Sequence, residues 1–562
     1  MTSSPEGNMQ TLKVQLLSGA MECSDYCLVS SSKWCAEQAN ALSIPLTEIP
    51  EVPKLKISPC NYPRYILAKN LFAMREYMRA TQLLESCNDT PAMFLKLYCS
   101  YLHGEKRKAE KAVDSVDVFE QREGTNNPEL RQLKTKIEEV MDNLDGYGLY
   151  LYAVVLRDLN LREEAIKELI KSVDQSPLNW AAWLLLAKTV SSKEALDALT
   201  LPQHWMQSFY IPQVHLELQL FEEAASFYKQ LSLQGLDKSP FILSQLAVCY
   251  YNLREIGDSY ECFVSQRELD PYSLENMDTF SNVLFVNNMK PELCLLAQSL
   301  QEIEMYKATT SFVVANYYSI SNQHSMAIVY FQRALKINRN YPAAWILLGH
   351  EYIELKQPEL ANEAYRQAKE LNAGDWRAWY GLGQTHELLQ MHSFALHYYR
   401  HAMELRPNDS RMVVAMGVCY ENLDNPDKAK RCFQRAIALG DNEQTGLVHL
   451  AKLHETLKET EEATRLYLQL VDKAERYGLF QPADEFSAHQ FLATHFLSNK
   501  ELNKAELHAK KCCEFPQTTE IGKSILKEIY SVTSVFKPNL TLPADISTGS
   551  DMDQISPNDS LK

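Results

Sequence analysis

From residue 240 onward, small and bulky apolar positions recur along the chain with a fixed period of 34 residues. Counted from Pro240, the eighth place of each block is small and the seventh is bulky and apolar. The small residues are Ala247, Ser281, Ala315, Gly349, Gly383, Gly417 and Ala451. Place twenty is mostly alanine, and place twenty-four is aromatic in six of the seven blocks. The pattern predicts two antiparallel helices per block, because a small residue at place eight lets the second helix approach closely.

This spacing of small, aromatic and alanine positions is the tetratricopeptide pattern. Neither helix of a block can bury its apolar face alone, so successive pairs must stack on one another. The sequence therefore predicts an all-α fold, a right-handed superhelical solenoid of tetratricopeptide repeats with a concave groove. Scaffolds of this kind bind extended peptides or helices.

Weaker copies of the pattern on both sides of the regular blocks suggest an order of segments. The predicted segments are an N-terminal helical segment at 1–60 that is part of a dimerising region, a degenerate array at 61–239 with a charged insertion near 105–142, seven regular repeats at 240–477, an insertion and final repeat-like pair at 478–530, and a disordered tail at 537–562. Exposed apolar edges of the N-terminal blocks, at Trp34, Leu67, Leu71 and Phe72, favour a homodimer.

The tail is rich in Ser, Asp, Asn and Pro and has few large apolar residues, so it cannot repay the entropy of ordering. Ser556 precedes Pro557 and is therefore a candidate phosphorylation site. An unmodified polar tail is the alternative.

Composition narrows the class of partner. A net charge of −16 argues against a nucleic-acid surface, and no run of 18 apolar residues predicts a membrane span. The 13 cysteines are scattered through predicted helix cores, which suits a reducing compartment. The sequence predicts a soluble intracellular protein whose partner is another protein or a basic peptide.

Catalytic and metal signals are weak, and the chain is predicted to be neither an enzyme nor a cofactor-binding protein. His-Glu pairs begin at His350, His386 and His454, but none continues to the second histidine of a zinc-protease helix. His397 and His401 are four residues apart and could hold a metal ion, yet no third ligand is evident. No glycine-rich phosphate loop of the nucleotide-binding types is present.

The predicted groove offers a more specific hypothesis. If the first helix of each block lines the groove, places two, five, nine and twelve point into it. The predicted groove residues are Asn316, Ile346, His350, Tyr380, Gln384, Glu387, Glu421 and Glu455. The three glutamates occupy place twelve of successive blocks, so they could clamp an arginine while Tyr380 stacks on it. The alternative is that they are solvated charges at helix ends, with Arg377 and Arg411 neutralising them.

Several strings go beyond the repeat consensus and resemble one family. They include SKWCAE from Ser32, ENMDTFSN from Glu275, YFQRALK from Tyr330, RAWYGLGQTHELL from Arg377 and LRPNDSRM from Leu405. Over about residues 10 to 530, the chain is similar to the eighth-subunit family of the anaphase-promoting complex.

That resemblance implies a non-catalytic scaffold in a cell-cycle ubiquitin ligase of the nucleus and cytoplasm. It implies a homodimer formed through the N-terminal repeats, contacts with other repeat and scaffold subunits, and a groove that receives the arginine-containing box of WD40 coactivators. A repeat adaptor or co-chaperone of another complex is the alternative. A co-chaperone groove would use Lys, Asn and Arg to hold a carboxylate, whereas this groove offers glutamates.

Overall fold

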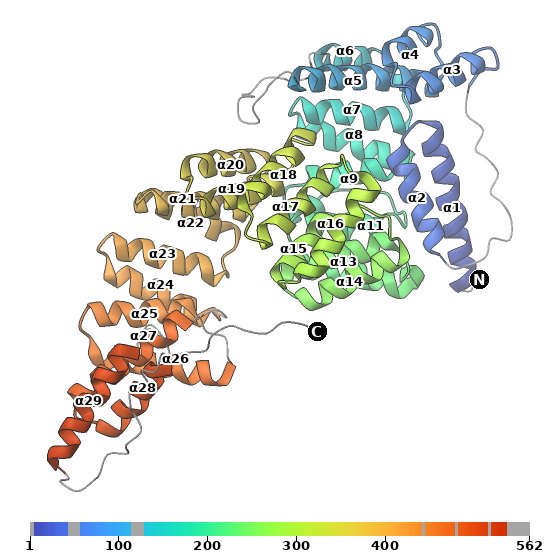
Figure 1. Cartoon of the computed structure of the whole chain (residues 1–562). Helices are drawn as coiled ribbons and strands as arrows, with labels where there is room; N and C mark the ends of the chain where they lie inside the picture. Colours follow the sequence, from blue (N-terminus) through green and yellow to red (C-terminus); the bar gives the residue numbers. More distant parts are fainter. Residues whose placement is uncertain are drawn as a thin grey trace, which may run out of the picture. The chain divides into compact units, whose positions relative to one another are not determined.

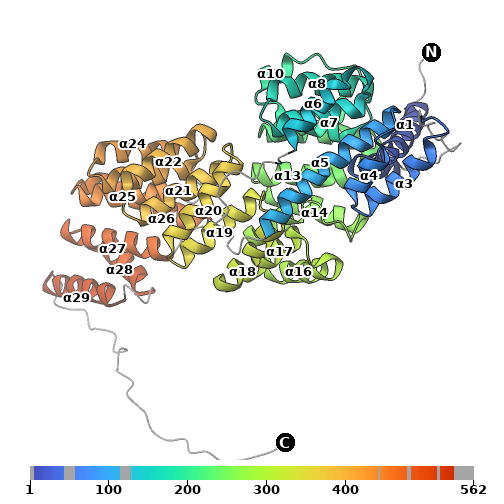
Figure 2. The same ribbon diagram turned by 90° about the horizontal axis from the view of Figure 1, so that it is seen from above.

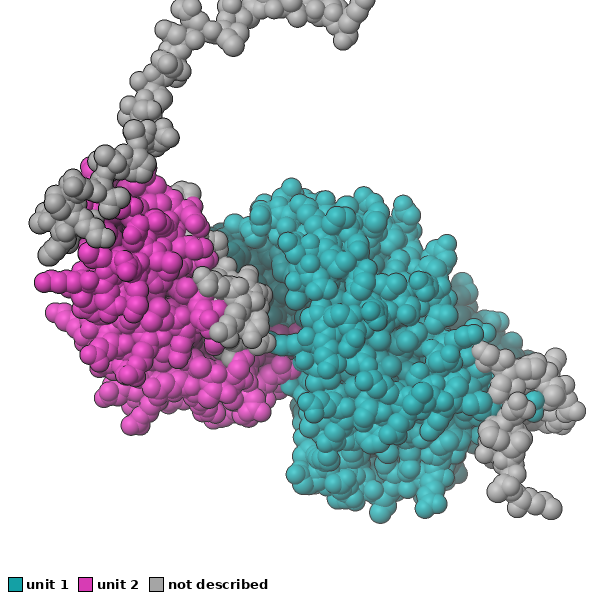
Figure 3. Space-filling view, turned by 90° about the horizontal axis from the view of Figure 1, so that it is seen from below, with its two compact units in different colours: residues 1–357 teal, residues 358–562 magenta. Residues whose placement is uncertain are grey.

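The computed structural model describes residues 5–42, 57–113, 127, 129–440, 444–477, 482–514 and 519–536. All regular elements within these ranges are helices, which confirms the all-α prediction (Figure 1). The chain divides into two compact units, unit 1 at residues 1–357 and unit 2 at residues 358–562 (Figure 3). The division falls inside the run of seven regular blocks.

Unit 1 contains a long series of helices and two short irregular turns of helix. Its elements are α1 (Pro5–Asp25), α2 (Val29–Ala41), α3 (Tyr62–Ala73), α4 (Tyr77–Leu83), α5 (Thr90–Val113), α6 (Leu130–Glu139), η1 (Met141–Asn143), α7 (Gly146–Asp158), α8 (Arg162–Gln175), α9 (Trp180–Thr189), α10 (Lys193–Asp197), α11 (Gln207–Glu217), α12 (Phe221–Leu231), η2 (Ser232–Leu236), α13 (Pro240–Leu253), α14 (Ile256–Leu269), α15 (Met277–Val286), α16 (Lys290–Glu304), α17 (Ala308–Ile320), α18 (His324–Ile337) and α19 (Pro342–Glu354).

Unit 2 is a simpler series of helices that pack as antiparallel neighbours (Figure 2). Its elements are α20 (Pro358–Leu371), α21 (Trp376–Leu388), α22 (His392–Leu405), α23 (Ser410–Asn422), α24 (Pro426–Ala438), α25 (Thr445–Thr456), α26 (Thr460–Tyr477), α27 (Pro482–Ser498), α28 (Leu502–Glu514) and α29 (Thr519–Phe536).

The small residue at place eight packs directly on the aromatic residue at place twenty-four of its own repeat. A Cβ atom added to Gly383 would lie 2.3 Å from Cε1 of Tyr399, and one added to Gly417 would lie 2.5 Å from Cε1 of Phe433. Both aromatic rings are fully buried. In these two repeats the helices therefore touch at a point where no side chain fits between them.

A left-handed residue ends the first helix of all seven regular repeats. The residues at place fifteen all have φ between 55° and 66°, namely Arg254, Asn288, Asn322, Lys356, Gln390, Asp424 and Lys458. In the Gln390 turn, the Met391 amide donates to the His386 carbonyl oxygen at 2.8 Å, which closes the end of α21. This turn reverses the chain so that the second helix can pack on the first.

Several sequence predictions fall wholly or partly outside the described residues. The tail at 537–562 with Ser556 lies outside them, as do residues 478–481 and most of 114–128. Within the predicted charged insertion, α6 buries Leu130, Leu133 and Ile137 in the core of unit 1. None of the described helices is both long and apolar enough to cross a membrane.

Candidate peptide-binding surface

The predicted groove residues lie on the first helices of their repeats, divided between the two units. In unit 1, α17 carries Asn316, and α19 carries Ile346 and His350. In unit 2, the remaining five lie on three first helices: Tyr380, Gln384 and Glu387 on α21, Glu421 on α23, and Glu455 on α25.

In unit 1 the predicted residues serve mainly as packing contacts. Asn316 is only 3% exposed, and its Nδ2 donates to Ser281 Oγ at 2.8 Å and to Asn282 Oδ1 at 2.9 Å. These bonds join α17 to α15. Ile346 is also buried, and His350 is half-buried. The amide donors of Asn316 are therefore already used within the unit.

Glu351 is a polar residue that sequence reasoning missed. It lies on α19 and is 5% exposed, and its carboxylate accepts from Ser319 Oγ at 2.6 Å and pairs with His324 Nδ1 at 2.8 Å. A buried carboxylate requires such partners. The available signal was its position, because place ten is Cys, Val, Tyr, Thr or Leu in the other regular blocks.

In unit 2, two of the three place-twelve glutamates have a partner in their own repeat. The Tyr399 hydroxyl donates to Glu387 Oε2 at 2.8 Å, and the Tyr467 hydroxyl donates to Glu455 Oε2 at 2.7 Å. Both tyrosines occupy place twenty-four and are buried. These two glutamates therefore satisfy phenol groups that would otherwise be unpaired beside the core.

Glu421 differs from the other two glutamates because its repeat carries Phe433 at place twenty-four, which has no hydroxyl. The Glu421 side chain is half-buried. Burial raises the pKa of its carboxyl group, and the nearby positive charge of Lys452 partly offsets that effect. Of the three glutamates, Glu421 is the one whose oxygens are not used by a place-twenty-four tyrosine.

The place-two arginines pair with aspartates at the start of their own helices. Arg377 Nη2 lies 3.0 Å from Asp375 Oδ2, and Arg411 Nη2 lies 2.8 Å from Asp409 Oδ2. Each aspartate is also the N-cap of that helix. Each of these arginines therefore has a carboxylate partner within two residues of it in the sequence.

An aromatic cluster lies beside this row. The Trp376 ring has the guanidinium carbons of Arg406 and Arg411 at 5.3 and 5.2 Å, so both arginines make cation–π contacts with it. The Tyr380 ring lies 6.3 Å from the Trp376 ring and 5.4 Å from the Tyr399 ring. Helix α21 therefore carries aromatic rings and a carboxylate, the groups that bind a guanidinium group.

Histidine pairs do not gather into a metal centre. No group of three or more metal-ligating side chains occurs among the residues described. His397 and His401 have ring centroids 4.7 Å apart, and His401 Nδ1 lies 3.0 Å from Glu404. A second pair is buried, with His489 Nδ1 2.9 Å from His508 Nδ1, and burial lowers the pKa of His489 to about 4.

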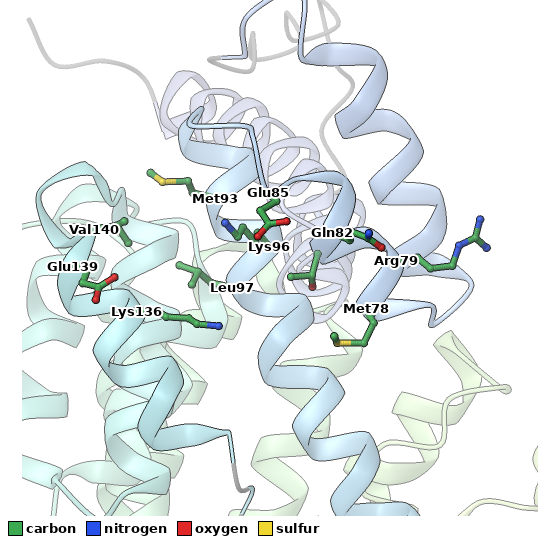
Figure 4. Close-up of a pocket in the computed structure, with 11 residues that line it drawn as sticks. Met78, Arg79, Gln82, Glu85, Met93, Lys96, Leu97, Lys136, Glu139 and Val140 are labelled. Carbon is green, nitrogen blue, oxygen red and sulfur yellow. The ribbon is translucent and has the colours of Figure 1, made fainter.

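A cavity of about 600 Å³ lies between α4, α5 and α6 (Figure 4). Its lining combines methionines with charges of both signs, namely Met78, Arg79, Thr81, Gln82, Glu85, Met93, Lys96, Leu97, Lys136, Glu139 and Val140. The lining holds no histidine or cysteine that could act as a general base or nucleophile. It is a mixed polar and apolar surface.

Comparison with known proteins decides the family. The model of Anaphase promoting complex subunit 8 / Cdc23 matches residues 11–247, and the tetratricopeptide repeat model matches residues 308–341, 342–375, 377–409 and 410–439. "Anaphase-promoting complex subunit 8" of Dictyostelium discoideum is 34% identical over 414 residues, covering 62% of this chain and 69% of the relative. The chain belongs to the anaphase-promoting complex subunit 8 family. The predicted tetratricopeptide fold and the predicted family are both confirmed.

Mammalian members of the subunit 8 family match a shorter segment. "Cell division cycle protein 23 homolog" of Bos taurus is 44% identical over 300 residues, which cover 53% of this chain and 50% of the relative. The matched part of the chain thus spans about half the length of this relative. The crystal structure of the hetero-tetramer Cut9-Hcn1 of the same complex superposes with a TM-score of 0.59 at 19% identity, over 94% of this chain and 96% of that chain. At that identity the likeness supports the fold.

The subunit 8 model and the general tetratricopeptide repeat model match different parts of this chain. The subunit 8 model matches residues in unit 1, whereas most of the residues matched by the general repeat model lie in the regular blocks around the unit boundary and in unit 2.

Proposed function

We propose that the chain is a non-catalytic scaffold subunit of the anaphase-promoting complex, a cell-cycle ubiquitin ligase, acting in the nucleus and cytoplasm. Family membership is the observation that carries this proposal. The described residues are devoted to stacked helix pairs, which present extended surfaces to other proteins. Ubiquitin transfer would then belong to cullin-like and RING subunits. Affinity purification of the tagged chain tests the proposal, because those subunits are expected to co-purify.

We further propose that unit 2 binds the arginine-containing box of WD40 coactivators. The supporting features are the half-buried carboxylate of Glu421, the aromatic face of Tyr380 and the amide of Gln384, which lie on neighbouring first helices. A guanidinium group binds carboxylates by charge-assisted bonds and stacks on aromatic rings. A co-chaperone role is less well supported, because a peptide carboxylate would meet this acidic row.

The third part of the proposal is a homodimer formed through the N-terminal region. On α3, α4 and the turn between them, large apolar side chains are exposed, with Tyr62 at 49%, Leu67 at 50%, Met74 at 71% and Met78 at 55%. A group of exposed apolar side chains on neighbouring helices indicates a surface that another protein covers. A second copy of the chain is the partner proposed here.

Leu67→Glu combined with Met74→Glu is expected to convert the dimer into a monomer, because buried charges without partners oppose association. Light scattering at micromolar concentration would give the wild type about twice the chain mass of 64.4 kDa, as a dimer. The variant would have the mass of a single chain. Leu233→Glu is the control, since Leu233 is 88% exposed on η2 and its replacement should leave the dimer intact. A wild-type chain of single mass would contradict the homodimer.

A further inference from the structure

The first two helices do not extend the series of repeats in the order of the chain. Helix α2 packs against α9 and α13, whose residues follow it by more than 130 positions (Figure 1). The α1–α2 pair thus lies across the first helices of later repeats within unit 1.

Trp34 on α2 is the apolar anchor of this contact. Its ring stacks on Trp180 with centroids 4.3 Å apart and planes 13° apart. The rings of Phe209 and Phe241 meet it edge-on at 5.2 and 5.9 Å. These partners come from α9, α11 and α13, and Trp34 is 5% exposed. One side chain of α2 is therefore enclosed by aromatic residues of three successive repeats.

Polar contacts fix the position of α2 on both sides of Trp34. Ser31 Oγ donates to Asn179 Oδ1 at 2.9 Å and accepts from the Ala181 amide at 3.0 Å. Gln38 Oε1 accepts from Ser239 Oγ at 2.8 Å. Ser31, Trp34 and Gln38 are spaced three and four residues apart and so share one face of α2. Outside this face, Lys33 Nζ pairs with Glu275 at 2.6 Å.

Helix α1 extends the same contact. Trp205 Nε1 donates to Gln15 Oε1 at 2.8 Å, and Tyr26, just after α1, stacks on Tyr147 with centroids 4.1 Å apart. The weaker blocks upstream of residue 240 are counted from Gly146, Trp180 and His204. The residues that meet α1–α2 then include the second place of five successive blocks, one of the rows that the sequence pattern assigned to the groove. These second-place residues are Tyr147, Ala181, Trp205, Phe241 and Glu275.

Three hydrogen-bond donors in this contact are buried without a partner. They are Trp34 Nε1, Gln38 Nε2 and Asn179 Nδ2. A buried donor that lacks an acceptor costs free energy, and water would supply the acceptor if the helices separated. The aromatic contacts therefore hold α2 in place while the unpaired donors favour its release.

We propose that the second-place row of unit 1 is a helix-binding surface, and that its resident ligand is the chain's own α1–α2 hairpin. The surface selects a helix with serine, tryptophan and glutamine on one face, at the spacing of Ser31, Trp34 and Gln38. The hairpin leaves this surface reversibly, and a second helix with the same pattern can replace it. While the hairpin is bound, the row is closed to peptide partners.

Competition with a labelled peptide tests this proposal on the full chain. The probe is a fluorescein-labelled peptide of residues 28–42, and fluorescence polarisation measures its binding. A chain carrying Trp34→Ala is expected to bind the probe at least tenfold more tightly than the wild type, whose own α2 competes. A probe that itself carries Trp34→Ala should bind neither chain. Equal binding of the intact probe to both chains, or its failure to bind a folded Trp34→Ala chain, would overturn the proposal.

A milder pair of variants covers the case in which Trp34→Ala does not fold. Lys33→Glu faces Glu275 with a like charge and is expected to increase probe binding by a few fold. Adding Glu275→Lys restores an opposite pair with the hairpin and places a like charge against Lys33 of the probe, so probe binding should fall to the wild-type level or below it. If Lys33→Glu folds and binds the probe no more tightly than the wild type, α2 is a fixed part of the core and is not exchanged for another helix.

Discussion

Replacing Gly383 by leucine is expected to destabilise unit 2 strongly and with it any partner binding by that unit. A Cβ atom at this position would lie 2.3 Å from Cε1 and 2.5 Å from Cδ1 of Tyr399. Tyr399 cannot turn away easily, because its ring is fully buried and its hydroxyl donates to Glu387. Overpacking of a core by extra methylene groups costs about 1–3 kcal/mol, and the whole leucine side chain must be placed here.

Thermal unfolding followed by circular dichroism measures this effect. The matched control is Gly257→Ala on α14, where a Cβ atom meets nothing within 4 Å, so the melting curve should stay unchanged or move slightly upward. Melting of Gly383→Leu at the wild-type temperature would contradict the role assigned to place eight.

The contact between places eight and twenty-four could be predicted from the sequence because it repeats. The same small and aromatic residues return in block after block, so periodicity alone marks place eight as the point of close helix approach and place twenty-four as aromatic. The structure then shows that Gly383 meets Tyr399 and that Gly417 meets Phe433. The left-handed turn at place fifteen gave a weaker signal. It is occupied by residues such as Lys356 and Gln390, neither of which marks positive φ in a sequence.

The position of α1–α2 could not be predicted in this way. Its contacts join residues about 120 to 240 positions apart and occur once, so they leave no periodic trace. Trp34 and Leu71 were predicted as exposed edges of a dimer, but the structure buries both, at 5% and 8% exposure. Leu67 is exposed as predicted. Truncation of the N-terminal helices would uncover Trp180 and Phe241 and is therefore a poor test of dimerisation.

The partners of the predicted groove residues could not be read from the sequence. Place twelve did identify the acidic row, but the bonds from Tyr399 to Glu387 and from Tyr467 to Glu455 depend on three-dimensional packing within one repeat. Asn316 looked free in the sequence because its partners, Ser281 and Asn282, lie one repeat upstream.

Glu421→Lys is expected to weaken coactivator binding severely while unit 2 stays folded. A hydrogen bond to a charged group contributes about 1.5–3 kcal/mol, and each 1.4 kcal/mol is about tenfold in affinity, so the loss should be roughly tenfold to a hundredfold or more. Glu387→Lys is a less clean test, because it would also leave the buried hydroxyl of Tyr399 without its acceptor. Titration calorimetry with an arginine-containing coactivator peptide measures the affinity.

A double-mutant cycle separates a direct contact from a general charge effect. The cycle combines Glu421→Gln, which keeps the size of the side chain but removes its charge, with an arginine-to-alanine change in the peptide. If the two groups touch, the losses of binding free energy from the two changes should not add. Additive losses, or equal affinity of folded Glu421→Lys and wild type, would mean that Glu421 is solvated surface and that the coactivator binds elsewhere.

The central claim is that this chain is a structural subunit of the anaphase-promoting complex. The most direct measurement is affinity purification of the tagged full chain from dividing cells, followed by mass spectrometry. The account predicts recovery of cullin-like and RING subunits together with other tetratricopeptide subunits, in comparable amounts and with no ubiquitin transfer by the chain alone. Recovery of chaperones without those subunits, or ubiquitin transfer by the isolated chain, would contradict it.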